Sequence, residues 1–337
     1  YLGKSAYDRA IQDFDVAIRL DPNYVQGVND RGAAYSQKGD LDSAIKDYDQ
    51  ALRIDPSYVL ALVNRGAAHR RKGEFDRAIG DFDEALRLDP GNVECFFGRG
   101  FAYQEKGDYD RAIQNYDDVI RLNPDYLLAY LNRADAYGAK GDYDRAILDF
   151  DRALRLNPNN ARAFNERGAV YARKGAYDRA IQSYDQALRL DPGFGLAYLN
   201  RGLAFRSKAD LDRAIQDFDQ VGRLRPHDAQ GFHERGTTYA QRAAFDLALR
   251  DLDQALRLNP GYAEAFHLRG IAHLGKGEYD LAIQDLDQAL RLKPDNAQAF
   301  HDRGNVYRFK EQYDRAIQDF DEALRLRDEY RKQQGAA

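Results

Sequence analysis

The chain of 337 residues contains no tryptophan, no methionine and a single cysteine, Cys95. One cysteine excludes an intrachain disulfide framework. No apolar run approaches the 18 residues that indicate a membrane-spanning helix, and the first residues do not resemble a signal peptide. We therefore expect a soluble protein without membrane insertion, with a cytoplasmic location favoured. Because the chain begins at Tyr1 rather than at methionine, we expect an excerpt or a processed form.

A strong positive charge is also missing. Lys and Arg number 50 against 55 Asp and Glu, which gives a formal charge of −5. A nucleic-acid binder needs a basic stripe for phosphates, so we expect no nucleic acid among the partners. No phosphate-binding loop, metalloprotease motif or nucleophile–histidine pairing occurs, and Cys95 shows no sign of activation. The sequence predicts a protein that is not an enzyme and has neither a cofactor nor a catalytic residue.

Proline is scarce, and its spacing is regular. The nine prolines lie 34 residues apart, and none falls outside this series, which runs Pro22, Pro56, Pro90, Pro124, Pro158, Pro192, Pro226, Pro260 and Pro294. Length alone suggests about two domains. A fixed period of this size instead indicates an array of structural repeats, and it overrides that expectation.

The repeats are numbered 1 to 9, with Val25 as position 1 of the first. They begin at Val25, Val59, Val93, Leu127, Ala161, Gly195, Ala229, Ala263 and Ala297. Residues 1–24 supply only positions 11–34 of an earlier repeat. We expect residues 25–330 to form one domain of nine repeats, followed by a tail of residues 331–337. Asp328 replaces the proline in repeat 9, so the last helix is free to run on.

Each repeat predicts two helices. In repeat 5, Phe164, Gly168 and Tyr171 share one helical face, and Gly175 follows as a helix C-cap. A second helix begins at Tyr177, with apolar residues on one face, and ends before the proline. Position 20 is alanine in all the repeats, and position 8 is glycine in all complete repeats but one. Small residues there let the paired helices approach closely.

The pattern Phe164, Arg167-Gly168, Tyr171, Ala180, Tyr184 and Pro192 resembles the tetratricopeptide (TPR) repeat. The resemblance covers the chain from Tyr1 to about Asp328. It implies an all-α solenoid of helix-turn-helix units wound as a right-handed superhelix. It also implies that the first helices line a concave groove, with positions 2, 5, 6, 9, 12 and 13 directed into it, and that this groove binds a peptide or protein segment.

Position 7, where the family usually has leucine, is arginine in every complete repeat, and position 25 is always aspartate. Position 23 is also aspartate, except for Asn115 and Ser183. An unpaired buried charge is costly. We therefore predict that each of these arginines pairs with an aspartate at position 23 or 25. The alternative is a ladder of free arginines for an acidic ligand.

Three aromatic residues fall outside the recurring aromatic positions. They are Phe97, Phe101 and Phe309, and all three occupy predicted groove positions of a first helix. Exposed aromatics are typical of binding anchors. The groove positions beside Phe97 and Phe101 carry Leu60, Val63, Leu128 and Leu131. We expect these residues to form an apolar surface. The alternative is that they pack against one another along a tight superhelix.

Two further apolar groups occupy groove positions, namely Leu196, Leu199 and Leu203, and Leu268, Ile271 and Leu274. Asparagine recurs at position 6 as Asn64, Asn132 and Asn200, with Asn29 and Asn165 beside this row. An asparagine side chain both donates and accepts hydrogen bonds, so this row is a candidate for holding a peptide main chain. The alternative is polar filling of a wet face. Lysine never occupies a groove position, which disfavours the carboxylate grip of chaperone-binding TPR proteins.

Histidine occupies position 5 of three successive repeats, as His233, His267 and His301. Such a row is suited to a pH-sensitive strip or a weak metal surface. Neighbouring helices lie about 8–10 Å apart, however, so one ion cannot join them at ligand distances of about 2 Å. The sequence therefore predicts no metal site.

The function predicted from the sequence is a protein-interaction scaffold whose partner is a peptide or protein. One alternative is self-assembly, in which solenoid ends stack into a homo-oligomer. Another is a non-catalytic regulatory arm of a larger enzyme.

Overall fold

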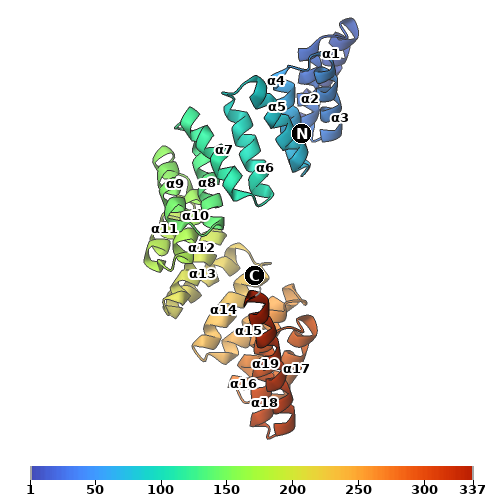
Figure 1. Ribbon diagram of the computed structural model, residues 1–337. Helices are drawn as coiled ribbons and strands as arrows, with labels where there is room; N and C mark the ends of the chain where they lie inside the picture. The colour runs from blue at the N-terminus through green and yellow to red at the C-terminus, as the bar shows by residue number, and fades with distance from the viewer. Residues whose placement is uncertain (1, 336–337) are drawn as a thin grey trace. The chain divides into compact units, whose positions relative to one another are not determined.

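The computed structural model describes residues 2–335, which form nineteen helices and no strand. The first helices of repeats 1 to 9 are α2 (Val25–Lys38), α4 (Val59–Arg71), α6 (Val93–Glu105), α8 (Leu127–Ala139), α10 (Ala161–Arg173), α12 (Gly195–Ser207), α14 (Ala229–Gln241), α16 (Ala263–Gly275) and α18 (Ala297–Phe309). The second helices, starting with the one before repeat 1, are α1 (Leu2–Leu20), α3 (Leu41–Ile54), α5 (Phe75–Leu88), α7 (Tyr109–Leu122), α9 (Tyr143–Leu156), α11 (Tyr177–Leu190), α13 (Leu211–Leu224), α15 (Phe245–Leu258), α17 (Tyr279–Leu292) and α19 (Tyr313–Gly335). The expected all-α solenoid of helix pairs is confirmed (Figure 1).

The chain divides into two compact parts, an N-terminal part, Tyr1–Ala163, and a C-terminal part, Phe164–Ala337. The right-handed superhelix over the whole chain stays a prediction. None of the described helices combines the length and the apolar character needed to cross a membrane.

Within a repeat, the two helices meet around one large side chain at position 24. Tyr48, Phe82 and Tyr116 are examples, and all three are almost completely buried. A Cβ atom added to Gly66 would lie 2.9 Å from the Phe82 ring, and one added to Gly100 would lie 2.9 Å from the Tyr116 ring. The glycine at position 8 is therefore required by the ring that lies against it, because real side chains do not pack so closely.

The turn between the two helices of a repeat depends on a residue with a positive φ at position 15. Gly175 has φ of 80°, which is the left-handed conformation that glycine adopts without strain. The next residue is an aspartate in several repeats, and it caps the second helix. Asp108, for example, accepts a hydrogen bond from the main-chain N–H of Arg111 at 3.1 Å.

Neighbouring repeats are joined by apolar packing and by a recurring arginine pair. Arg201 donates to both carboxylate oxygens of Asp217 in its own repeat, at 2.6 and 2.8 Å, and to Asp185 of the preceding repeat at 2.6 Å. The same double pairing is made by Arg31, Arg65, Arg133, Arg235, Arg269 and Arg303. The predicted pairing of position 7 with positions 23 and 25 is confirmed for these residues. The guanidinium groups hold adjacent repeats together.

Two repeats lack the aspartate at position 23, and their arginines use the residue that replaces it. Arg99 donates to the side chain of Asn115 at 2.8 Å and pairs with Asp83 at 2.5 Å. Arg167 donates to the hydroxyl of Ser183 at 3.2 Å. A neutral acceptor therefore fills the place of the carboxylate.

A second ion pair joins successive repeats at the turn. Lys72 lies 2.6 Å from Asp42 of the preceding repeat, and Lys276 lies 2.8 Å from Asp246. In repeat 7 an arginine replaces the lysine, and Arg242 lies 2.5 Å from Asp212. These pairs are exposed, so water and salt screen them and their effect on stability is small.

Successive first helices also contact one another, as α4 does with α6 and α14 with α16. Pairs of successive second helices in the described chain show no contact of similar extent. The first helices therefore lie on the inner side of the curve within each part. The last helix, α19, extends to Gly335, so it runs past the position that proline occupies in the other repeats. This agrees with the expected effect of Asp328.

Candidate functional site

The surface around Phe97 and Phe101 lies on three consecutive first helices, α4, α6 and α8. We call it the Phe97–Phe101 surface, and its members are Leu60, Val63, Phe97, Phe101, Leu128 and Leu131. Leu60 is 47% exposed and Leu128 is 50% exposed. Val63, Phe97, Phe101 and Leu131 are half-buried. The sequence-predicted apolar residues are therefore distributed over one inner face, with leucines at its two sides.

Phe97 is more tightly packed than its place outside the recurring aromatic positions suggests. Its ring centroid lies 5.9 Å from that of Tyr116, on α7, and 5.2 Å from that of Tyr126, which follows α7. Both contacts are tilted ring pairs of the kind that stabilise aromatic clusters. Phe97 thus contributes to packing within repeat 3 as well as to the surface.

Phe101 lies under a cation. The guanidinium carbon of Arg70, on α4, lies 4.5 Å from the centroid of the Phe101 ring. This distance is within the range of a cation–π contact. The apolar surface is therefore bordered by a positive charge, which the sequence analysis did not single out among the arginines at groove positions.

The asparagine row is partly occupied by bonds within the protein. Asn64 donates to the side-chain oxygen of Asn29 at 3.0 Å, and Asn200 donates in the same way to Asn165 at 3.0 Å. Asn29 and Asn165 are each 1% exposed. Each of these bonds joins two successive repeats. It occupies an amide N–H of Asn64 or Asn200, which is then not available to a ligand.

Asn132 differs from the other two members of this row. Phe97 occupies the place in the preceding repeat where Asn64 and Asn200 find their acceptor. A phenyl ring offers no amide oxygen, so this link is absent in repeat 4. Asn132 is half-buried on α8, the helix that also carries Leu128 and Leu131.

Phe309 lies far along the chain from the other two aromatics. It is 53% exposed, at the end of α18. Its ring is parallel to that of Tyr279, at a centroid distance of 6.0 Å. Phe309 belongs to the C-terminal part and is not a member of the Phe97–Phe101 surface.

The two other apolar groups are mixed in exposure. Leu196 is 40% exposed, whereas Leu199 is 3% exposed and belongs to the core beside Phe218. Leu268 packs against a core cluster shared by repeats 7 and 8, and Leu274 packs against one shared by repeats 8 and 9. These groups therefore offer less open apolar area than the Phe97–Phe101 surface.

The histidines at position 5 interact with neighbouring carboxylates and rings. His267 Nε2 lies 2.8 Å from Asp302, and His301 lies 3.3 Å from the same carboxyl group. These hydrogen bonds, together with one from Gln298, oppose the effect of burial and lower the pKa of Asp302. His233 stacks on Tyr262 at 4.8 Å. No group of three or more metal-ligating side chains occurs in residues 2–335.

Cys95 is completely buried between repeats 2 and 3, and burial raises the pKa of its thiol to about 12. A thiolate is the nucleophilic form, so this thiol is unreactive in the folded protein.

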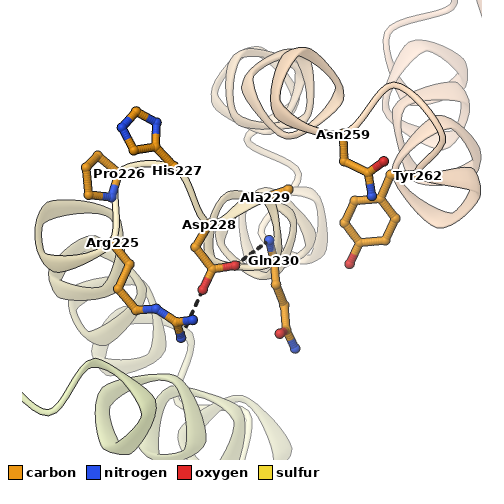
Figure 2. A pocket seen from close by; sticks show the side chains of 8 residues that line it. All are labelled: Arg225, Pro226, His227, Asp228, Ala229, Gln230, Asn259 and Tyr262. Carbon is orange, nitrogen blue, oxygen red and sulfur yellow. Dashed lines mark hydrogen bonds and ion pairs between the residues drawn. The ribbon is translucent and has the colours of Figure 1, made fainter. Parts of the chain in front are cut away.

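A surface depression of about 550 Å³ lies between two inter-repeat loops of the C-terminal part. Arg225 and Asp228 form an ion pair at 3.0 Å on one side, and Asn259 and Tyr262 line the other (Figure 2). Asp228 also accepts a hydrogen bond from the main-chain N–H of Gln230 at 3.0 Å. The sequence signal for this place is Arg225, because most other repeats have asparagine or aspartate at that position.

Family models agree with this architecture. A model described as tetratricopeptide repeat matches residues 29–93, 131–193 and 180–229, and further models described as TPR or tetratricopeptide repeats match residues 82–114, 103–141, 274–309 and 297–330. Together they cover residues 29–229 and 274–330. The chain belongs to the tetratricopeptide repeat family. No curated protein sequence matches the chain.

Solved structures share the fold. A tetratricopeptide repeat protein from Parabacteroides merdae is 22% identical, with a TM-score of 0.57, over 74% of this chain and 98% of that one. The hetero-tetramer Cut9–Hcn1 of the APC/C is 18% identical, with a TM-score of 0.54, over 94% and 78%. YrrB, described as a TPR protein with an unusual peptide-binding site, is 25% identical over 55% and 96%, with a TM-score of 0.47. The first two likenesses are evidence of fold alone.

Proposed function

We propose that this protein is an interaction scaffold that binds a peptide or protein segment on the Phe97–Phe101 surface. The observation that carries the proposal is the exposure of Leu60 and Leu128 on either side of two half-buried aromatic rings. These residues lie on first helices, which form the inner side of the curve in the N-terminal part. A partner that covers them removes apolar area from water, and this burial favours binding by about 25 cal/mol per Å² of apolar area.

The mode of binding follows from the spacing of the anchors. They occupy three neighbouring helices, and helices pack about 8–10 Å apart. An extended segment of several residues spans that distance, with apolar side chains on the leucines and rings. We expect the amide of Asn132 to hydrogen-bond the main chain of such a segment.

The test uses exposed residues, because Phe97 also packs on Tyr116 and Tyr126 and its removal would lower stability. Random dodecapeptides displayed on phage are selected on the protein, and the binders are synthesised with a fluorescein label. The double variant Leu60→Asp/Leu128→Asp is expected to weaken their binding at least tenfold by fluorescence anisotropy. Its helicity should be unchanged, because both leucines are about half exposed.

Leu196→Asp is the matched control, since Leu196 occupies the same repeat position on α12. It should leave binding unchanged. Failure to select any peptide that binds, or equal loss of binding in both variants, would contradict the proposed site.

Self-assembly is a second candidate, and the outer face of α19 favours it. Leu324 and Ile317 are each 58% exposed, whereas Leu290, the counterpart of Leu324 in repeat 8, is 7% exposed. An uncovered apolar face is suited to pack against another copy. Light scattering over a concentration series is expected to show growth in mass if this face assembles, and Ile317→Asp/Leu324→Asp should abolish it. A constant monomer mass would exclude this function.

A further inference from the structure

Arg70 is a cation on the inner face that lacks the partner its repeat position has elsewhere. It lies at position 12 of repeat 2, and its guanidinium covers the Phe101 ring. Its Nε atom is buried and has no hydrogen-bond partner in the described part of the chain. Burial lowers the pKa of this side chain. A buried donor without an acceptor is unfavourable, because it has given up its bonds to water.

The same position in repeat 6 shows what such an arginine pairs with. Arg206 lies at position 12 on α12, and its Nη2 atom lies 2.7 Å from a carboxylate oxygen of Glu234. Arg206 also donates to the main-chain oxygen of Glu234 at 3.3 Å. Glu234 is at position 6 of the next repeat, so this pair joins α12 to α14.

Gly98 stands at position 6 of the repeat that follows Arg70. Glycine supplies no carboxylate, and no larger residue fits there easily, because a Cβ atom on Gly98 would lie 2.5 Å from the Phe82 ring. The Phe82 ring of repeat 2 thus excludes an acid from position 6 of repeat 3. Repeat 7 has Glu234 at this position, and it pairs with Arg206. Glu105, also on α6, is near enough to favour the charged form of Arg70, but the two form no ion pair within residues 2–335.

We propose that Arg70 binds an acidic side chain of the partner, directly beside the apolar residues that pack on the Phe97–Phe101 surface. This inference rests on the proposed function and names the chemistry of its ligand, a peptide with Asp or Glu next to a hydrophobic residue. Charge complementarity supports it, because the ligand carboxylate would take the role that Glu234 has for Arg206. A hydrogen bond between two charged groups is about twice as strong as a neutral one.

The arrangement also explains the position of Phe101. An aromatic face beneath a guanidinium favours the cation and holds it in one orientation. The planar fork of the arginine then presents its donors to a carboxylate in fixed geometry. Arg70 and the Phe97–Phe101 surface would therefore recognise an acidic residue of the ligand together with its hydrophobic neighbour.

The experiment uses three synthetic fluorescein-labelled peptides that share one sequence obtained by the phage selection. The three peptides carry Glu, Gln or Lys at one position. The set is repeated for each position beside the hydrophobic anchor of the peptide. At one position the wild-type protein is expected to bind the Glu peptide at least tenfold more tightly than the Gln peptide, and the Lys peptide most weakly. Raising the salt concentration should reduce this preference.

Variants of Arg70 then test whether this residue causes the preference for the Glu peptide. Arg70→Gln should bind the Glu and Gln peptides equally, and Arg70→Glu should prefer the Lys peptide. Arg70→Lys should keep part of the preference, because it retains charge without the fork. Arg206→Gln is the matched control and should behave as wild type, since Arg206 is already paired. Circular dichroism of each variant checks that it is folded.

The outcomes separate the two proposals. If peptides bind on the Phe97–Phe101 surface but no position prefers Glu, or if Arg70→Gln keeps the preference, the role of Arg70 is wrong and the binding surface stands. If no peptide binds at all, both proposals are wrong. Glu105→Gln adds a further check, because loss of this nearby acid should strengthen binding of the Glu peptide.

Discussion

The charged residues of this chain are mainly structural, and the arginine at position 7 is the clearest case. Recurrence of Arg with Asp predicted the ion pair correctly. It did not predict that the same arginine pairs with two aspartates, at position 23 of its own repeat and at position 25 of the preceding repeat. That division depends on how the repeats stack, which no local pattern specifies.

We expect Asp217→Ala to destabilise the C-terminal part by about 2 kcal/mol, because it leaves a mostly buried guanidinium with one partner fewer. Arg201 would retain only Asp185. Asp217→Asn should cost less, since Asn115 already serves Arg99 as a neutral acceptor. The measurement is hydrogen exchange of α12 and α13 amides in mild urea. Equal protection in Asp217→Ala and wild type would contradict the structural role.

At the scale of the helix, the turns show where the repeat pattern is strained. Position 15 has a positive φ throughout, and in six described repeats it is glycine. Ala209, Ala243 and Glu311 occupy it in the other three, with φ between 56° and 60°. A side chain in this conformation costs about 1–2 kcal/mol, because its Cβ approaches the next carbonyl oxygen. The period made the helix pairs predictable, but only the backbone shows that these three residues share the glycine conformation.

We therefore expect Ala243→Gly to raise the stability of the C-terminal part by about 1 kcal/mol, net of the greater chain entropy of glycine. Ala244→Gly is the matched control. Ala244 has φ of −85° at the start of α15, so glycine there relieves no strain and should be neutral or destabilising. Urea unfolding followed by circular dichroism compares the two. A higher midpoint for Ala244→Gly than for Ala243→Gly would contradict the argument.

Over the whole molecule, the sequence predicted the class of fold and the repeat boundaries because both depend on periodic contacts. It also placed Phe97, Phe101, Leu60 and Leu128 on the inner face through their repeat positions. It could not show that Phe97 packs on Tyr126 or that Asn64 is held by Asn29. The asparagine bond joins different repeats, so its geometry follows from how the repeats stack. The ring contact joins the two ends of repeat 3, so its geometry follows from the folding of the whole repeat rather than from one helix. Arg70 was overlooked because the position that would supply its acid lies in the next repeat, where Gly98 stands.

The last prediction concerns the modular order of the array. Deletion of residues 263–296 removes one period, and it brings Arg303 to Asp253 and Lys310 to Asp246 in place of Asp287 and Asp280. Because each repeat interacts only with its neighbours, the shortened protein should fold with the same helicity per residue. Deletion of residues 263–279 is the control. It removes α16 without the following helix, so two second helices become neighbours and the glycine–ring contacts are lost. Circular dichroism and size-exclusion chromatography should show a folded monodisperse protein only for the deletion of a full period. If both deletions fold equally well, then stability does not depend on the order of first and second helices.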